Sequence, residues 1–234
     1  MSITQNKVVV AGGGLMGTGI AHAFASSGFV TVLVDSNEAA AAKALSAVAK
    51  ILDDGVRLGK LDAAVADAAK SRLTTQADLA AASAGAALLV ETVTENIAVK
   101  KQVVATAAAH MLPDAIIATN TSALSVTEIA TAVPQPERVV GMHFFNPVHK
   151  MKLVELVRGI ATSDETVART REYSDALGKT SIIVNESPGL TTSRMSAMLG
   201  NEAMWMLQEG VATAEDIDTA LRMGFNHPMG PLEL

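Results

Sequence analysis

The first half of the chain alternates between short apolar runs and longer segments rich in strong helix formers. Short apolar runs are typical of buried strands, and strands that alternate with helices are typical of a parallel sheet covered on both faces. The pattern predicts strands at 7–11, 30–34, 87–91, 115–119, 138–142, 152–157 and 180–184. It predicts helices at 17–27, 37–54, 61–70, 96–110 and 164–177. Ser163 is the expected N-cap of the last helix and Gly178 its stop.

The pattern changes after the last predicted strand. Ser187-Pro188-Gly189 interrupts the chain, and from there apolar residues recur at helical spacing. Thr213 is expected to open a second helix that Gly224 closes. We therefore predict an α/β domain at 1–186 and a helical C-terminal domain at 187–234. Because so short a segment cannot bury two amphipathic helices alone, we expect this domain to be incomplete or to need the first domain or a second subunit.

Composition narrows the possible classes of protein. Of the 234 residues, 49% are hydrophobic and 18% are charged, which is typical of a globular chain. The formal charge of −6, with no block of basic residues, disfavours nucleic acids and anionic membranes as partners. The longest small and apolar stretch, 80–90, is too short to cross a bilayer and is interrupted by Ser83 and Gly85. We expect neither a nucleic-acid nor a membrane partner.

The absence of cysteine removes several kinds of chemistry. It excludes disulfides, thiolate nucleophiles and cysteine-ligated zinc, and we expect no metal site.

The apolar N-terminal run resembles a signal peptide, but the glycines between positions 12 and 19 would break up its apolar core. A cytoplasmic location is the expectation.

The segment Gly12-Gly13-Gly14-Leu15-Met16-Gly17 matches the pattern G-x-G-x-x-G between a predicted strand and a predicted helix. Gly12 permits a tight turn, Gly14 lets a pyrophosphate approach the backbone, and Gly17 lets helix and strand pack closely. The free amides and the helix dipole then favour phosphate. The sequence predicts a dinucleotide-binding turn in a Rossmann-type, doubly wound and mostly parallel sheet.

Asp35 directly follows the second predicted strand. A carboxylate at this place can accept hydrogen bonds from an adenosine ribose and repels a 2′-phosphate. Ser36 and Asn37 come next, so no arginine favours NADP. In the alternative interpretation Asp35 only caps the following helix. We predict NAD as the cofactor.

Hydride transfer from an alcohol requires a base, and histidine is the usual choice near neutral pH. His143 stands out because it ends a predicted strand, where ligands bind in such sheets, and is followed by Phe144-Phe145-Asn146-Pro147. Glu155 lies in an otherwise apolar predicted strand and could orient His143 if the two segments run side by side. The alternative is a structural histidine and a solvent-facing glutamate. His22, inside the first helix, is expected to be solvated or packed.

Seven segments, in this order and spacing, are similar to one known family. They are the glycine turn with Leu15-Met16-Gly17, Glu91-Thr92-Val93-Thr94-Glu95-Asn96, Thr119-Asn120-Thr121-Ser122, 141–147, 151–155, 187–189 and 227–234. They resemble the L-3-hydroxyacyl-CoA dehydrogenases of bacteria and mitochondria, which include the short-chain 3-hydroxybutyryl-CoA dehydrogenases. The resemblance covers the whole chain. It implies reversible, NAD-dependent oxidation of a short-chain (S)-3-hydroxyacyl-CoA to the 3-oxoacyl-CoA.

The resemblance also implies roles for individual residues. His143 would be the base that takes the 3-hydroxyl proton, Glu155 its orienting carboxylate, and Ser122 a hydroxyl near the substrate oxygen and the nicotinamide. On sequence alone, Ser122 could equally cap its own loop. The positions that match NAD contacts, besides Gly12, Gly14, Leu15, Met16 and Gly17, are Asp35, Glu95, Lys100, Ser122 and Asn146. Glu95 and Lys100 would otherwise pass for a surface pair.

The chain departs from the family pattern at two places. Ser193 stands before Arg194 where the family usually has an asparagine, so the polar group at this substrate position has a shorter reach. Family members also continue past the segment that ends at Leu234, and we expect a fragment or a lost remainder. The C-terminal helices of the family form a dimer, which implies a homodimer here. Arg57 and Lys60 are candidates for contacting coenzyme A, or else solvated charges.

Two other functions stay open at this point. One is a related NAD-dependent dehydrogenase of a free hydroxy acid or sugar acid. The other is a crystallin-like protein that binds NAD without turnover.

Overall fold

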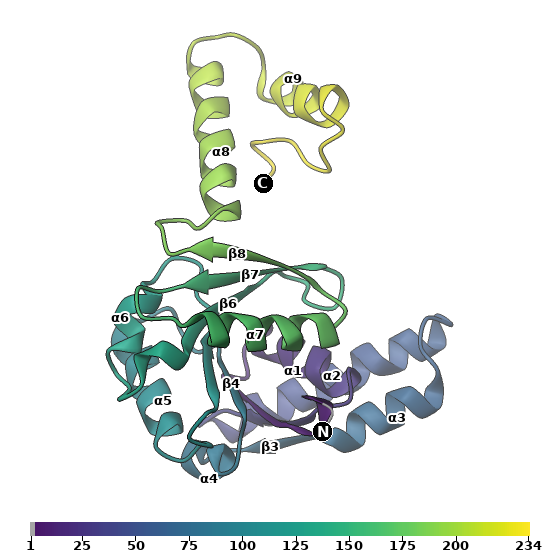
Figure 1. Ribbon diagram of the computed structural model, residues 1–234. Helices are drawn as coiled ribbons and strands as arrows, with labels where there is room; N and C mark the ends of the chain where they lie inside the picture. Colours follow the sequence, from purple (N-terminus) through teal and green to yellow (C-terminus); the bar gives the residue numbers. More distant parts are fainter. Residues whose placement is uncertain (1–2) are drawn as a thin grey trace. The chain divides into compact units, whose positions relative to one another are not determined.

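A computed structural model describes residues 3–234 (Figure 1). The chain divides into two compact units, Met1–Glu186 and Ser187–Leu234. The first unit is an α/β structure and the second consists of helices and connecting turns. No helix within residues 3–234 is long and apolar enough to cross a membrane.

The first unit is built on one sheet with the strand order β3-β2-β1-β4-β5-β6-β7-β8. Its strands are β1 (Lys7–Ala11), β2 (Val30–Val34), β3 (Leu73–Gln76), β4 (Leu88–Glu91), β5 (Ile116–Thr119), β6 (Val139–Phe144), β7 (Leu153–Arg158) and β8 (Thr180–Asn185). All neighbours pair in parallel except β6 and β7, which are antiparallel. The predicted Rossmann-type, mostly parallel sheet is confirmed. Its strand order reverses between β1 and β4, the place where such sheets bind ligands.

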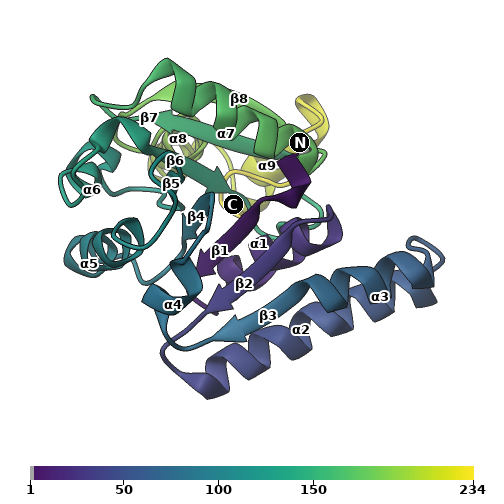
Figure 2. The same ribbon diagram turned by 60° about the horizontal axis from the view of Figure 1, so that its bottom comes forward.

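Helices connect these strands. They are α1 (Leu15–Ser26), α2 (Glu38–Arg57), α3 (Ala63–Arg72), α4 (Leu79–Ser83), α5 (Ile97–Ala108), α6 (Val126–Ala130) and α7 (Asp164–Ala176), with short 3-10 turns at Ile3–Gln5 and Pro136–Arg138. The Ser163 hydroxyl accepts a hydrogen bond from the Thr166 amide, so the predicted N-cap of α7 is confirmed. Helices α2 and α3 lie side by side as a hairpin (Figures 1 and 2).

The sequence analysis did not predict one strand and one helix of the sheet domain. Strand β3 has one buried residue, Leu73, so it carries no apolar run. Helix α4 is a single short turn inside the alanine-rich stretch, where Asp78 caps it by accepting from the amides of Ala80 and Ala81. Both elements lie beside the pocket described below, so missing them also concealed part of the site.

The core of the first unit holds the site's scaffold in place. The central strands β4, β5 and β6 are buried along their whole length, and β1 is buried beyond its first residue. Phe24, Phe29 and Tyr173 pack edge-on or tilted against one another between α1 and α7, and the Tyr173 hydroxyl accepts from Asn6. Burying an aromatic or aliphatic side chain contributes roughly 1.5–3 kcal/mol, so this core fixes α1 against β1.

The second unit contains α8 (Thr192–Gln208), α9 (Ala214–Thr219) and a π-helical turn at Ala220–Gly224. The Thr213 hydroxyl accepts from the Asp216 amide and caps α9, as predicted. Few apolar side chains of this unit are buried, Ala203 and Ile217 among them. Large apolar side chains on it are exposed, including Met195, Met198, Trp205, Met223 and Phe225.

Candidate active site

The glycine turn joins β1 to α1 in a conformation that side chains would not permit. Gly12 has φ of +111°, and a Cβ there would lie 2.8 Å from the carbonyl oxygen of Thr92. A Cβ on Gly17 would lie 1.8 Å from the carbonyl oxygen of Gly12. No atom lies within 4 Å of the place where Gly14 would carry a Cβ. The turn is therefore tight on its inner side and open at Gly14, as close approach of a pyrophosphate requires.

Asp35, at the end of β2, is tied to this turn. Its Oδ2 accepts from the Gly13 amide at 2.8 Å, and its Oδ1 accepts from the Asn37 amide at 2.9 Å. The N-cap of α2 is Asn37, whose side chain accepts from two amides of the first helical turn. The structure thus argues against the alternative that Asp35 caps this helix. Asp35 instead stands next to the turn at the rim of a pocket.

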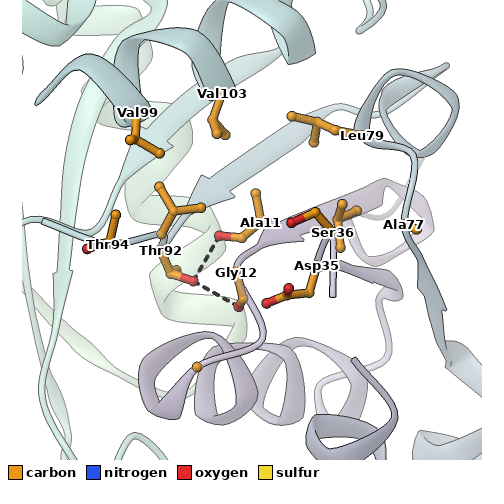
Figure 3. Close-up of a pocket in the computed structure, with 13 residues that line it drawn as sticks. Ala11, Gly12, Asp35, Ser36, Ala77, Leu79, Thr92, Thr94, Val99 and Val103 are labelled. Atoms are coloured by element: carbon orange, nitrogen blue, oxygen red, sulfur yellow. Dashed lines mark hydrogen bonds between the residues drawn. The ribbon is translucent and has the colours of Figure 1, made fainter. Parts of the chain in front are cut away.

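A pocket of about 410 Å³ opens beside the turn (Figure 3). Its walls are largely apolar, with Val99 and Val103 from α5 and Leu79 from α4. Figure 3 shows these side chains across the pocket from Gly12 and Asp35. A slot with apolar walls and a carboxylate at its rim fits an adenosine, with the base between the walls and the ribose at Asp35.

The sequence analysis missed several residues that line this pocket: Ala77, Leu79, Thr92, Thr94, Val99 and Val103. Val99 and Val103 are spaced to share one face of α5, which was a usable signal. Ala77 and Leu79 could not be placed, because they follow the unpredicted strand β3.

His143 and Glu155 are directly opposite each other on the antiparallel strands β6 and β7. Their Nδ1 and Oε2 atoms are 2.6 Å apart, and the Glu155 side chain is fully buried. A buried carboxylate needs a donor, so Glu155 fixes the tautomer in which Nδ1–H donates to it and Nε2 keeps its lone pair. The Phe145 ring lies 4.6 Å from the imidazole, centroid to centroid. The structure therefore brings together the histidine and the glutamate that the sequence analysis paired.

Gly141 sets how closely these two strands approach. It pairs with Val157, two residues along from the His143–Glu155 pair. A Cβ on Gly141 would lie 2.7 Å from the Cβ of Val157 and 3.2 Å from Val126 Cγ2. Because such a contact is too short for real Cβ atoms, only glycine permits this spacing.

Ser122 and Asn146 lie in the loops that follow β5 and β6, and both are exposed. These loops leave the sheet at the carboxyl ends of parallel strands, the same edge from which the glycine turn leaves β1. The Ser122 amide donates to Glu95 Oε1 at 3.2 Å, and Asn146 precedes a cis proline. Both residues stand at the edge where ligands of such sheets bind.

Lys100 is not part of a surface pair. Its side chain is completely buried, and Nζ donates to Glu91 Oε1 at 3.0 Å while lying 3.2 Å from Glu95 Oε2. Glu95 is 41% exposed and faces outward. A direct contact between Lys100 and NAD would require its buried Nζ to become accessible. The structure therefore favours the more exposed Glu95 over Lys100 as a residue that could contact the cofactor.

The charges and hydrogen bonds of this group shift its acidity. Burial raises the pKa of Glu91, although the Lys100 charge and the Thr119 hydroxyl act in the opposite direction. Partial burial also acts to raise the pKa of Glu95, but the Thr121 hydrogen bond and the Lys100 charge outweigh it and hold that pKa below its usual range. Glu95 is thus an anion at neutral pH.

The candidate substrate residues lie in two different units. Arg57 ends α2 and forms an exposed ion pair with Asp54 at 2.9 Å. Such pairs contribute little to stability, so the guanidinium can exchange partners. Lys60 follows in the turn between α2 and α3. Ser193 lies in the first turn of α8, within the second unit.

Two parts of the chain match two domains of one known protein family. Residues 7–187 match the family described as 3-hydroxyacyl-CoA dehydrogenase, NAD binding domain. Residues 189–234 match the family described as 3-hydroxyacyl-CoA dehydrogenase, C-terminal domain. Together the two matches span almost the whole chain.

Individual relatives agree with these matches. A probable 3-hydroxybutyryl-CoA dehydrogenase of Bacillus subtilis is 40% identical over 97% of the chain and 79% of its own length. The 3-hydroxyadipyl-CoA dehydrogenase of Escherichia coli is also 40% identical, and the match covers 49% of its length. The crystal structure of (S)-3-hydroxybutyryl-CoA dehydrogenase from Ralstonia eutropha superposes with a TM-score of 0.93 at 39% identity, covering 97% of this chain and 80% of that one.

Proposed function

The chain belongs to the 3-hydroxyacyl-CoA dehydrogenase family, and on that premise we propose that His143 and Glu155 carry out its proton transfer. The chain is an NAD-dependent enzyme that oxidises the 3-hydroxyl of a 3-hydroxyacyl-CoA to the 3-oxo group, reversibly. The observation that carries the proposed roles is the 2.6 Å contact between His143 Nδ1 and the buried Glu155.

Each residue has a definite task in this reaction. When bound at the glycine turn and Asp35, NAD⁺ supplies the acceptor for the hydride that leaves C3. His143 Nε2 takes the proton of the 3-hydroxyl, and Glu155 stabilises the imidazolium that forms. The Ser122 hydroxyl donates a hydrogen bond to the substrate oxygen. In the reverse direction His143 returns the proton to that oxygen.

Glu95 and Asn146 are proposed to contact the cofactor from the carboxyl edge of the sheet. Both are partly or fully exposed there, which supports the assignment. The proposed site for the adenosine end is the pocket beside Asp35, and that for the pyrophosphate is the turn from Gly12 to Gly17, with Leu15 and Met16.

A short-chain substrate such as 3-hydroxybutyryl-CoA is proposed, on the strength of the relatives that carry that activity in their names. A second candidate substrate is 3-hydroxyadipyl-CoA, because the Escherichia coli relative named for it has a similar sequence identity to this chain. Arg57 and Lys60 are proposed to meet the phosphates of coenzyme A, and Ser193 a polar group of the substrate. Turnover of acetoacetyl-CoA and of a longer 3-oxo thioester with a terminal carboxylate, compared at equal concentrations, separates the two candidates.

A homodimer in the cytoplasm is the proposed form of the enzyme. The apolar side chains that α8 exposes, among them Met195, Met198 and Trp205, support an interface with a second copy. Sedimentation at two concentrations tests this, and a monomeric mass at both would contradict it.

The variant His143→Ala tests the proposed base. Loss of a general base typically lowers turnover by about a hundred to ten-thousandfold, and the adenosine pocket should still bind NADH because His143 does not line it. Turnover and NADH affinity are measured by absorbance and by fluorescence titration. His110→Ala, at an exposed histidine in the turn that follows α5, serves as the control. Unchanged turnover in His143→Ala would refute the assignment.

A further inference from the structure

A buried ion pair lies beneath the carboxyl edge of the sheet. Glu91, the last residue of β4, and Lys100, on α5, both have side chains that are 0% exposed. The Glu91 carboxylate accepts from Lys100 Nζ, from the Val93 amide at 2.6 Å and from the Thr119 hydroxyl at 2.6 Å. Every one of these partners is a donor, so the carboxylate is satisfied only as an acceptor.

This pair is linked to the loop that carries Ser122. Lys100 Nζ lies 3.2 Å from Glu95 Oε2, and Glu95 Oε1 accepts from the Thr121 hydroxyl and the Ser122 amide. Glu95 is too exposed for burial alone to fix its side chain, so its place depends on these contacts. Within residues 3–234 the Ser122 hydroxyl forms no hydrogen bond, so it can donate one to a substrate.

A second connection runs from Glu91 to the strand that carries His143. The Glu91 carbonyl oxygen accepts from the Asn120 amide at 2.8 Å. The Asn120 side-chain oxygen accepts from the Phe144 amide at 2.9 Å. Phe144 directly follows His143, so Glu91 is connected to both loops that present the proposed chemistry.

We propose that Glu91 is a positioning residue: by anchoring Lys100 and Thr119, it fixes the Thr121–Ser122 turn and thereby the place of the Ser122 hydroxyl. This inference rests on the role proposed above for Ser122. A stabilising role alone explains the arrangement poorly, because a buried ion pair costs desolvation and an apolar pair of the same volume is often as stable. The contacts from Glu91 through Lys100 and Glu95 end on the Ser122 amide, so they are suited to fixing the position of Ser122.

The test is a double-variant cycle between Glu91→Gln and Ser122→Ala. Gln has the shape of Glu, but its NH₂ group must face a donor in this environment. Glu91→Gln alone should lower kcat about tenfold, since small misplacements of reacting groups are costly. The NADH dissociation constant should change less than about threefold, because Glu91 does not line the adenosine pocket. In the Ser122→Ala background, Glu91→Gln should change kcat by less than about twofold.

Glu172→Gln, the same chemical change at an exposed position of α7, is the matched control and should keep the kcat of the natural chain. If Glu91→Gln does not fold, Thr119→Val removes a single donor without changing the shape and should show a smaller loss with the same dependence on Ser122.

The inference would be overturned if Glu91→Gln lowered kcat by the same factor with and without Ser122→Ala. It would also be overturned if Glu91→Gln changed the melting temperature alone. Full kcat in Ser122→Ala would also overturn it, and would leave the assignment of His143 intact. A fully active His143→Ala would instead overturn the proposed function.

Discussion

Asp35 has two tasks at the scale of a single side chain. It accepts a hydrogen bond from the Gly13 amide in the glycine turn, and in the proposed function its charge repels a ribose 2′-phosphate. A change at this position therefore affects both the turn and the choice of cofactor.

The double variant Asp35→Ala with Ser36→Arg should reverse the preference from NADH towards NADPH, because repulsion is replaced by attraction. The ratio of kcat/KM for the two cofactors is the measurement. Ser36→Arg alone is the control and should keep NADH preferred, since Asp35 still repels the phosphate. An unchanged ratio in the double variant would show that Asp35 does not read the ribose.

His22 is neither a catalytic group nor an ordinary solvated residue. It packs beside Ser26 and lies edge-on to His149, 6.0 Å between ring centroids. Burial, aided by the charges of His149 and Lys179, lowers the pKa of His22 to about 4 from the 6.5 of a free histidine. At pH 5 the unfolded chain therefore binds a proton at this position that the folded chain does not.

Because the pKa of His22 is lowered in the folded state, its contribution to stability is complete above pH 6.5 and is lost as the pH falls towards 4. Between pH 7.5 and 5 this loss amounts to at most about 2 kcal/mol. The variant His22→Gln should lack it. Free energies of unfolding in urea at the two pH values measure the effect, with the exposed His110→Gln as control. An identical pH dependence in His22→Gln and the natural chain would refute this account.

At the scale of elements, the pair of strands β6 and β7 determines whether the site is assembled. Their antiparallel register puts His143 opposite Glu155, and Gly141 permits the close approach. The site thus depends on a contact between strands as well as on its own side chains.

Gly141→Ala should force these strands apart, since its Cβ would meet Val157 at 2.7 Å. Overpacking of this kind costs about 1–3 kcal/mol, and a lengthened His143–Glu155 contact should lower kcat as well. Thermal unfolding and steady-state kinetics are the measurements. Gly224→Ala, where a Cβ meets nothing within 4 Å, is the control. Normal stability and kcat in Gly141→Ala would show that the spacing is not critical.

The elements also show what a sequence can predict. Strand β1 and its glycine turn were predictable because an apolar run and a glycine pattern are local signals. The edge strand β3 was not, since its single buried residue depends on packing against the rest of the sheet. His143 and Glu155 were both identified, but their contact required the register of β6 and β7. The burial of Lys100 follows from tertiary packing and left no trace in the local pattern.

At the scale of the whole molecule, the first unit presents the glycine turn, Asp35, Ser122 and the His143–Glu155 pair at the edge of one sheet. A nicotinamide cofactor and a proton acceptor on one scaffold account for hydride and proton transfer together. The second unit matches the C-terminal domain of the same family. These features and the family membership agree on a thioester of a 3-hydroxy acid as the substrate, and one assay distinguishes this activity from turnover of a free hydroxy acid and from binding of NAD without turnover.

That assay is the loss of NADH absorbance when the chain is given acetoacetyl-CoA, with parallel reactions that contain NADPH or free acetoacetate. The account predicts turnover with NADH and the thioester, and little or none in the two parallel reactions. Turnover of free acetoacetate at a similar rate would contradict the assignment of an acyl-CoA substrate. Tight binding of NADH without any reduction of acetoacetyl-CoA would contradict the assignment of this chain as a working dehydrogenase.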